Sequence, residues 1–215
     1  MTIKANLERI RKELPEEVTL VAVSKTKPVS DLMEAYSAGQ RIFGENKIQE
    51  MAEKQKQMPA DVQWHMIGHV QTNKVKQMAD FVDLIHGVDS LKLLQEIDRQ
   101  AKKHERTINC LLQMHIAEEE TKFGMDKQEL EDLLRSPEFS AMQNIKVKGL
   151  MGMATFTDNQ QQIEKEFTQL KTIYDELGPR YGFRILSMGM SGDFPIAVRC
   201  GSNMVRIGSS IFGHR

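Results

Sequence analysis

The sequence is poor in cysteine and has no excess of charge of either sign. Its 215 residues include two cysteines, Cys110 and Cys200, and neither belongs to a paired-cysteine spacing that would bind a metal or build a disulfide framework. This pattern is typical of a protein in a reducing compartment. The formal net charge is -1, so the whole chain has no general electrostatic attraction for nucleic acid or for an anionic membrane.

Long apolar runs are also missing. No stretch approaches the ~20 apolar residues that span a bilayer, and the charged, amphipathic N-terminus has no apolar signal core. These absences predict a cytoplasmic protein with no membrane partner. The sequence contains no dinucleotide fingerprint, P-loop, nucleophile elbow, linker or internal repeat, so we expect a single domain over 1–215.

What the sequence does contain is a regular alternation of strand-like and helix-like segments. An amphipathic helix over 3–14 comes first, and helices over 71–79 and 159–177 are among those that separate the strands. The predicted strands are 19–24, 41–45, 62–68, 81–88, 107–116, 145–153, 184–188 and 204–207. Eight such units in a little over 200 residues predict an α/β fold, a closed (β/α)8 TIM-type barrel with an extra N-terminal helix. An open, doubly wound sheet is the alternative.

The first predicted strand leads into a lysine. Val21, Val23 and Lys25 share one face, because side chains alternate along a strand. An amine at the end of a buried strand is costly to desolvate unless it has a partner, a lowered pKa or a covalent bond. Taken alone, Lys25 is more simply interpreted as a surface lysine whose stem packs and whose ammonium is solvated.

Two segments rich in glycine and serine follow the last two predicted strands, at 188–193 and 205–213. In a barrel, functional groups gather where the strands end, and phosphates are often bound after the seventh and eighth strands. We therefore expect a phosphate site there, although glycine and serine are common in ordinary turns. Arg206, inside the last strand, needs an acceptor such as a phosphate, the carboxylate of Asp193 or a ring nitrogen.

A lysine after the first strand and a phosphate site after the last two become neighbours when a barrel closes. Together they predict a phosphorylated aldehyde held as a Schiff base. Pyridoxal 5'-phosphate (PLP) is one candidate, and the sugar-phosphate substrate of a class I aldolase is the other. His65 and His69 are four apart, but Gly68 and the strand-like run argue against a helical metal pair, so we expect no metal.

Several motifs resemble those of a known family, in order along nearly the whole chain. They are Val23-Ser-Lys-Thr-Lys-Pro28, Phe43-Gly-Glu-Asn46, Trp64-His-Met-Ile-Gly68 with Gln71-Thr-Asn-Lys74, Thr121-Lys-Phe-Gly124, Gly149-Leu-Met151, Ser187-Met-Gly-Met-Ser191 and Val205-Arg-Ile-Gly-Ser-Ser-Ile-Phe-Gly213. They are similar to those of the pyridoxal phosphate homeostasis proteins, which are single-domain relatives of bacterial alanine racemase. The resemblance implies a fold-type III PLP-binding barrel.

The resemblance also implies the cofactor-binding residues. Lys25 would carry PLP covalently as an internal aldimine, and Arg206 would face the pyridine nitrogen. Lys122 corresponds to a family lysine near the site, a candidate secondary PLP lysine in transfer. The other implied residues are Ser191, Gly208 and Ser209 at the phosphate, and Asn46, His65 and Met151 along the pocket.

The implied site does not favour carbanion chemistry. An arginine at the ring nitrogen keeps the pyridine unprotonated and weakens it as an electron sink. A two-base racemase also needs a second acid or base on the opposite face of the ring. In the racemase relatives a tyrosine from a second, β-rich domain supplies that group, and we expect no such domain here. The tyrosines of this chain, Tyr36, Tyr174 and Tyr181, fall in helix-like segments or a turn.

We therefore predict a non-catalytic, monomeric PLP-binding protein that takes part in intracellular vitamin B6 homeostasis. Its predicted partners are PLP and recipient PLP-dependent apo-enzymes, with no nucleic acid. The alternatives are a PLP-dependent amino-acid racemase or decarboxylase, a Schiff-base aldolase, and a scaffold that acts through its surface helices.

Overall fold

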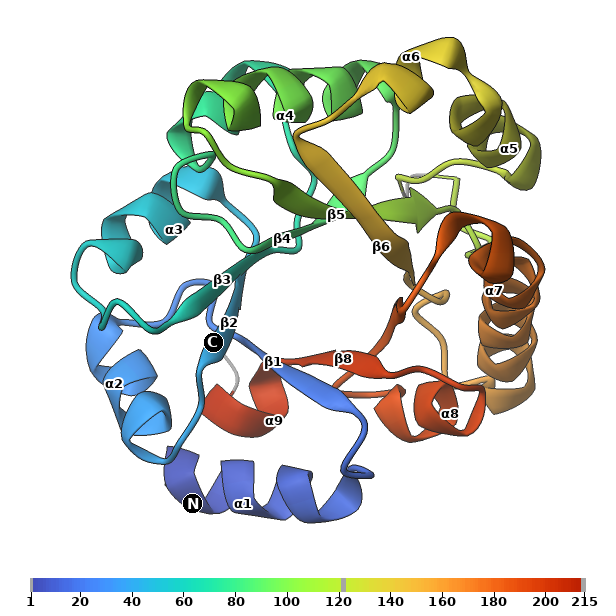
Figure 1. Cartoon of the computed structure of the whole chain (residues 1–215). Coiled ribbons are helices and arrows are strands. Elements are labelled where there is room, and N and C mark those ends of the chain that lie inside the picture. The colour runs from blue at the N-terminus through green and yellow to red at the C-terminus, as the bar shows by residue number, and fades with distance from the viewer. Residues whose placement is uncertain (1, 121–122, 214–215) are drawn as a thin grey trace.

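Eight parallel strands close into a barrel in the computed structural model, which describes residues 2–120 and 123–213. The strands follow one another around the ring in chain order, and β1 pairs with β8 to close it (Figure 1). Their bounds are β1 Thr19–Val23, β2 Ile42–Glu45, β3 Gln63–Met66, β4 Leu84–Val88, β5 Ile108–Met114, β6 Ile145–Gly152, β7 Ile185–Met190 and β8 Met204–Ile207. The predicted closed barrel is confirmed over the open sheet.

The helices surround this ring of strands (Figure 1). They are α1 Ile3–Glu13, α2 Val29–Ser37, α3 Ile48–Gln55, the 3-10 helix η1 Thr72–Gln77, α4 Leu91–Lys103, α5 Lys127–Arg135, α6 Pro137–Ala141, α7 Gln160–Tyr181, α8 Phe194–Arg199 and α9 Ser209–Phe212. The extra helix α1 packs against α2 and α9, so it joins the beginning of the chain to the end of the barrel. No helix in the described part of the chain is both long and apolar enough to cross a bilayer.

Two helices differ from their prediction. The segment predicted as a helix over 71–79 is the short η1, which has no side-chain cap at Gln71, and 3-10 geometry is common in such short connectors. Helix α7 continues past the predicted end at 177, through Pro179, and ends at Gly182 in the left-handed conformation (φ 70°). Glycine adopts that conformation without the steric cost that a side chain would add.

The buried side chains form two layers. The larger cluster lies between the strands and the surrounding helices, and a smaller cluster fills the inside of the barrel. The inner cluster consists of Val21, Leu84, Leu111, Met151 and Met204. Val21 lies on the face of β1 that the alternation assigned to Val21, Val23 and Lys25. Because the interior of the barrel is packed, a site can lie only at one of its ends.

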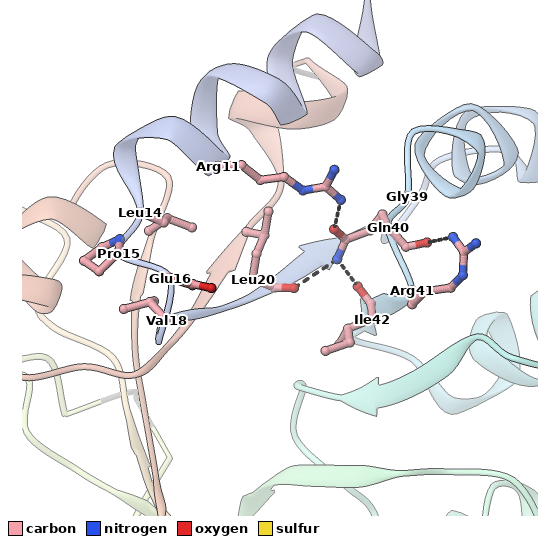
Figure 2. A pocket seen from close by; sticks show the side chains of 10 residues that line it. All are labelled: Arg11, Leu14, Pro15, Glu16, Val18, Leu20, Gly39, Gln40, Arg41 and Ile42. Atoms are coloured by element: carbon pink, nitrogen blue, oxygen red, sulfur yellow. Dashed lines mark hydrogen bonds between the residues drawn. The ribbon is translucent and has the colours of Figure 1, made fainter.

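The amino end of the barrel holds a cavity of about 380 Å³ between α1, β1 and β2 (Figure 2). The buried Gln40 amide donates to the carbonyls of Leu20 (2.9 Å) and Ile42 (2.8 Å), and its Oε1 accepts from Arg11 Nη2 (3.0 Å). A second Arg11 nitrogen donates to the carbonyl of Ala38 (2.7 Å). These bonds tie α1 to the first two strands.

Candidate functional site at the carboxyl end of the barrel

A cavity of about 490 Å³ lies at the opposite end, where the strands finish. Its volume falls in the range of typical small-molecule sites, roughly 300–1,000 Å³. Most of the residues predicted to bind the cofactor line it, namely Lys25, Asn46, Ser191, Arg206, Gly208 and Ser209. They come from the ends of β1, β2, β7 and β8, which lie far apart in the sequence.

Lys25 follows β1 by two residues and lines this cavity. Its side chain is half-buried, and within the described ranges its amine makes no hydrogen bond or ion pair. Val21 of β1 is in register with Arg206 of β8. The predicted proximity of the lysine to the last strand is thus confirmed, and the free amine opens into the same cavity as Arg206.

The ends of β7 and β8 bring hydrogen-bond donors together. The hydroxyl oxygen of Ser191 accepts from the backbone N–H groups of Gly208 (3.3 Å) and Ser210 (3.5 Å). A Cβ atom at Gly208 would lie 3.1 Å from the Val23 carbonyl oxygen, so this position packs closely against the end of β1. Backbone N–H groups beside a hydroxyl are a donor set that suits a phosphate.

Arg206 is buried and partly anchored. Its Nη1 donates to Ser187 Oγ (2.6 Å), and its Nη2 donates to the Gly152 carbonyl (3.1 Å). Burial lowers the pKa of Arg206 to about 10, while the carboxylate of Asp193 acts in the opposite direction. The guanidinium is therefore charged at neutral pH. The Arg206 side chain lines the cavity, and it has N–H groups beyond the two that are bonded.

A row of hydrogen bonds continues from Arg206 into the barrel. His86 Nδ1 lies 3.0 Å from Ser187 Oγ, and His86 Nε2 lies 3.0 Å from His65 Nδ1. Because Arg206 donates to Ser187, the hydroxyl can donate to His86, which can then donate to His65. Burial lowers the pKa of His65 to about 3 and that of His86 well below its usual value, so both rings are neutral at physiological pH.

The structure thus places two of the predicted site residues below the cavity. His65 and Met151 are buried in the barrel and do not line it. Met153, two residues further along the chain and just past the end of β6, lines the cavity instead, and the alternation of strand residues is the signal in the sequence that points to it. Lys122, the predicted secondary lysine, lies outside the described residues.

The sequence prediction missed an aromatic wall of the cavity. His69 stacks on Phe123, with ring centroids 3.8 Å apart, and Phe156 on the rim is 96% exposed. Loop residues such as these carry no periodic signal, and the spacing of His69 from His65 bears only on a metal pair. Residues 2–120 and 123–213 contain no group of three or more His, Cys, Asp or Glu arranged to hold a metal.

Comparison with known proteins agrees with this architecture. A family model described as the alanine racemase N-terminal domain matches residues 1–215. The pyridoxal phosphate homeostasis protein of Pasteurella multocida is 38% identical, with 100% of this chain and 98% of the relative covered. That of Schizosaccharomyces pombe is 37% identical, with 100% of this chain and 93% of the relative covered.

The chain belongs to the pyridoxal phosphate homeostasis protein family. The resemblance seen in the sequence motifs is thereby confirmed. Among solved structures, PipY of Synechococcus elongatus without PLP has 36% identity and a TM-score of 0.93, covering 99% of this chain and 100% of PipY. PipY with PLP bound matches with a TM-score of 0.90 and the same coverage.

This family shares its barrel with alanine racemase. The racemase of Clostridium difficile superimposes with a TM-score of 0.80 at 15% identity, and the match covers 60% of the racemase chain. At this level of identity the likeness concerns the fold. Members of the homeostasis family, such as the P. multocida protein, match over nearly their whole length.

Proposed function

We propose that this protein binds PLP at the carboxyl end of the barrel as a Schiff base with Lys25, and serves PLP homeostasis without catalysing a reaction of its own. One observation carries the proposal. The amine of Lys25, which has no partner among the described residues, opens into the same cavity as the donor set of Ser191 and Gly208. The full-length similarity to PipY, which has been solved with PLP bound, supports it.

The residues of the cavity match the chemical groups of PLP. The cofactor supplies an aldehyde, an aromatic ring with a nitrogen, and a phosphate. The Lys25 amine would add to the aldehyde carbon, so that a carbon–nitrogen bond forms and water leaves, and no further reactant is needed. Ser191 and the N–H of Gly208 suit the phosphate, and Arg206, which keeps its proton at neutral pH, would donate to the ring nitrogen.

Among the described residues, the same cavity has no tyrosine that could act as the second acid or base of a racemase. The three tyrosines lie on α2 and α7, and none of them lines the cavity. His69 is the imidazole on the cavity wall, with Nδ1 3.6 Å from Asp89 Oδ2. This ion-pair geometry favours, as a second candidate, a PLP-dependent amino-acid racemase or decarboxylase that uses His69. PLP-dependent apo-enzymes are the predicted recipients in the carrier function.

Absorbance and borohydride trapping test the carrier function. The protein is mixed with PLP, reduced with borohydride, and the modified peptide is identified by mass spectrometry. We expect stoichiometric modification at Lys25 in the wild type and none in Lys25→Ala. Lys27 donates to the Phe212 carbonyl (3.0 Å), and Lys27→Ala should still be modified at Lys25. Full trapping in Lys25→Ala, or no PLP binding by the wild type, as expected for a Schiff-base aldolase, contradicts the proposal.

Solvent deuterium separates the two candidates. A racemase incorporates deuterium from the solvent at the α-carbon of an amino acid, and a carrier does not. We expect no incorporation at a useful rate across a broad amino-acid panel. Incorporation that is lost in His69→Gln would establish the enzyme and overturn the non-catalytic function.

A further inference from the structure

The turn that carries Lys25 has an unfavourable backbone conformation. Thr26, the next residue, has φ 64°, which is in the left-handed region. Glycine visits this region freely, whereas a β-branched residue such as threonine rarely does, because its side chain crowds the backbone. Such outliers persist when the surrounding structure holds them, and they concentrate at functional sites.

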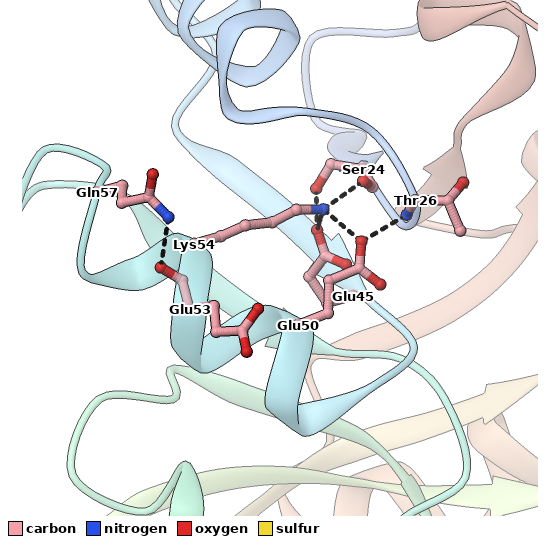
Figure 3. A network of polar contacts seen from close by, with 7 residues as sticks. All are labelled: Ser24, Thr26, Glu45, Glu50, Glu53, Lys54 and Gln57. Carbon is pink, nitrogen blue, oxygen red and sulfur yellow. Dashed lines mark hydrogen bonds and ion pairs between the residues drawn. The ribbon is translucent and has the colours of Figure 1, made fainter.

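A network of polar contacts holds both neighbours of Lys25 (Figure 3). The N–H of Thr26 donates to Glu50 Oε1 (2.5 Å). Lys54 Nζ donates to the Ser24 carbonyl (2.7 Å), to Glu45 Oε1 (2.8 Å) and to Glu50 Oε1 (2.7 Å). The Ser24 hydroxyl also donates to Glu45 Oε1 (2.6 Å). Three segments of the chain, the β1 exit, the end of β2 and helix α3, therefore meet at one ammonium group.

Burial gives this network its rigidity. Lys54 is 5% exposed and Glu45 is fully buried, so neither side chain can exchange its partners for water. All three N–H donors of Lys54 are used, which fixes the ammonium in one position. Burial raises the pKa of Glu45, and the hydrogen bonds from Lys54 and Ser24 oppose that shift. Burying a charged group costs desolvation free energy, so the presence of this network is weak evidence that it stabilises the fold.

We propose that Glu45, Glu50 and Lys54 are positioning residues that hold the Ser24–Thr26 turn in its left-handed form and so direct Lys25 toward the cofactor cavity. The network binds the residues on both sides of Lys25 and leaves the Lys25 amine free. The part of this inference that concerns PLP rests on the proposed function. The part that concerns the turn is a property of the protein without ligand.

Glu50→Ala tests the network with little damage to the core, because the Glu50 side chain is 23% exposed. It removes the acceptor of the Thr26 N–H. We expect amide hydrogen exchange at Thr26 to become at least tenfold faster in the ligand-free protein, and the dissociation constant for PLP to rise about tenfold, which corresponds to about 1.4 kcal/mol. Glu50→Gln keeps an oxygen acceptor, so the exchange rate at Thr26 and the dissociation constant for PLP should rise less.

Thr26→Gly provides a specific rescue. Glycine adopts the left-handed conformation without a partner, so Thr26→Gly combined with Glu50→Ala should recover most of the lost PLP affinity. Glu53→Ala is the matched control, because Glu53 lies on the same helix but its carboxylate takes no part in the network (Figure 3). It should leave both the exchange rate and the dissociation constant unchanged.

The outcomes separate this inference from the proposed function. If the wild type binds no PLP, the proposed function fails, and exchange at Thr26 still decides whether the network holds the turn. If the wild type traps PLP and Glu50→Ala matches it in exchange rate and in affinity, the positioning role is wrong. A loss of affinity that Thr26→Gly does not restore also overturns it, since the turn would then not be the element through which Glu50 acts.

Discussion

The two ends of the barrel both carry polar side chains, but these side chains are used differently. At the amino end, Gln40 is hydrogen-bonded to Arg11 and to two backbone carbonyls (Figure 2). Arg11 also donates to the Ala38 carbonyl. At the carboxyl end, the Lys25 amine has no partner in the described structure, and Arg206 has donors beyond the two that are bonded. Both ends contain a cavity, so cavity size alone would not tell them apart.

This difference shows how a binding end is distinguished from a structural end. Polar groups that are already satisfied hold the fold together and gain little from a ligand, whereas unsatisfied donors around a cavity favour a ligand that accepts from them. The row of His86 and His65 lies between the two ends. Its members are buried and hydrogen-bonded to one another, which makes it resemble the structural end.

The largest expected effect concerns this buried row. The pKa of His65 is lowered to about 3, whereas the unfolded chain has the usual value of about 6.5. Between these values the unfolded state binds a proton that the folded state does not, so stability is lost as the pH falls through this window. The loss is about 1.4 kcal/mol per pH unit for His65, up to about 5 kcal/mol near pH 3.

Urea unfolding of the wild type and of His65→Gln between pH 7 and pH 4 checks this expectation. The variant should lose less free energy of unfolding over this range. Glu45 has a raised pKa, so above the pKa of the unfolded chain it changes the free energy of unfolding with pH in the opposite direction. It does so in both proteins, so its contribution cancels when the two pH dependences are subtracted. Equal slopes for the two proteins would show that His65 is not held neutral by burial.

The next effect tests the structural end. Gln40→Ala removes the amide that donates to the carbonyls of Leu20 and Ile42, and buried acceptors without a donor cost about 1–3 kcal/mol. We expect the free energy of unfolding to fall by about 2 kcal/mol, measured in urea, with the PLP dissociation constant unchanged. Gln128→Ala on the exposed face of α5 is the control. A clear loss of PLP affinity in Gln40→Ala would break the distinction between the two ends.

The smallest effect tests the binding end. Ser191→Ala removes the hydroxyl at which the Gly208 and Ser210 N–H groups meet, and we expect PLP to bind about tenfold more weakly, or about 1.4 kcal/mol. Stability should change by less than about 0.5 kcal/mol, as for most surface substitutions. Ser210→Ala keeps its backbone N–H and should bind PLP normally. Equal affinities of Ser191→Ala and the wild type, by fluorescence titration, would remove Ser191 from the phosphate site.

Much of the fold and part of the site could be predicted from the sequence. The alternation of strand and helix patterns predicted all eight strands, because each strand is a short apolar run bounded by polar turns. The alternation of side chains along β1 predicted that Lys25 lies on the same face as Val21 and Val23, since side-chain direction along a strand is a local property. The end of α7 was missed, because the apolar face that predicted the helix ends at Leu177, whereas the helix continues through Pro179 to Tyr181.

The sequence alone determined the barrel, the strand exits at which polar residues gather, and the family to which the motifs belong. Only the tertiary structure decided that His65 and Met151 are buried below the cavity, that His69 and Phe123 form part of its wall, and that Lys54 joins the turn of Lys25 to α3. Depth along the barrel axis and contacts between distant segments depend on how all eight strands pack, and no local pattern records them.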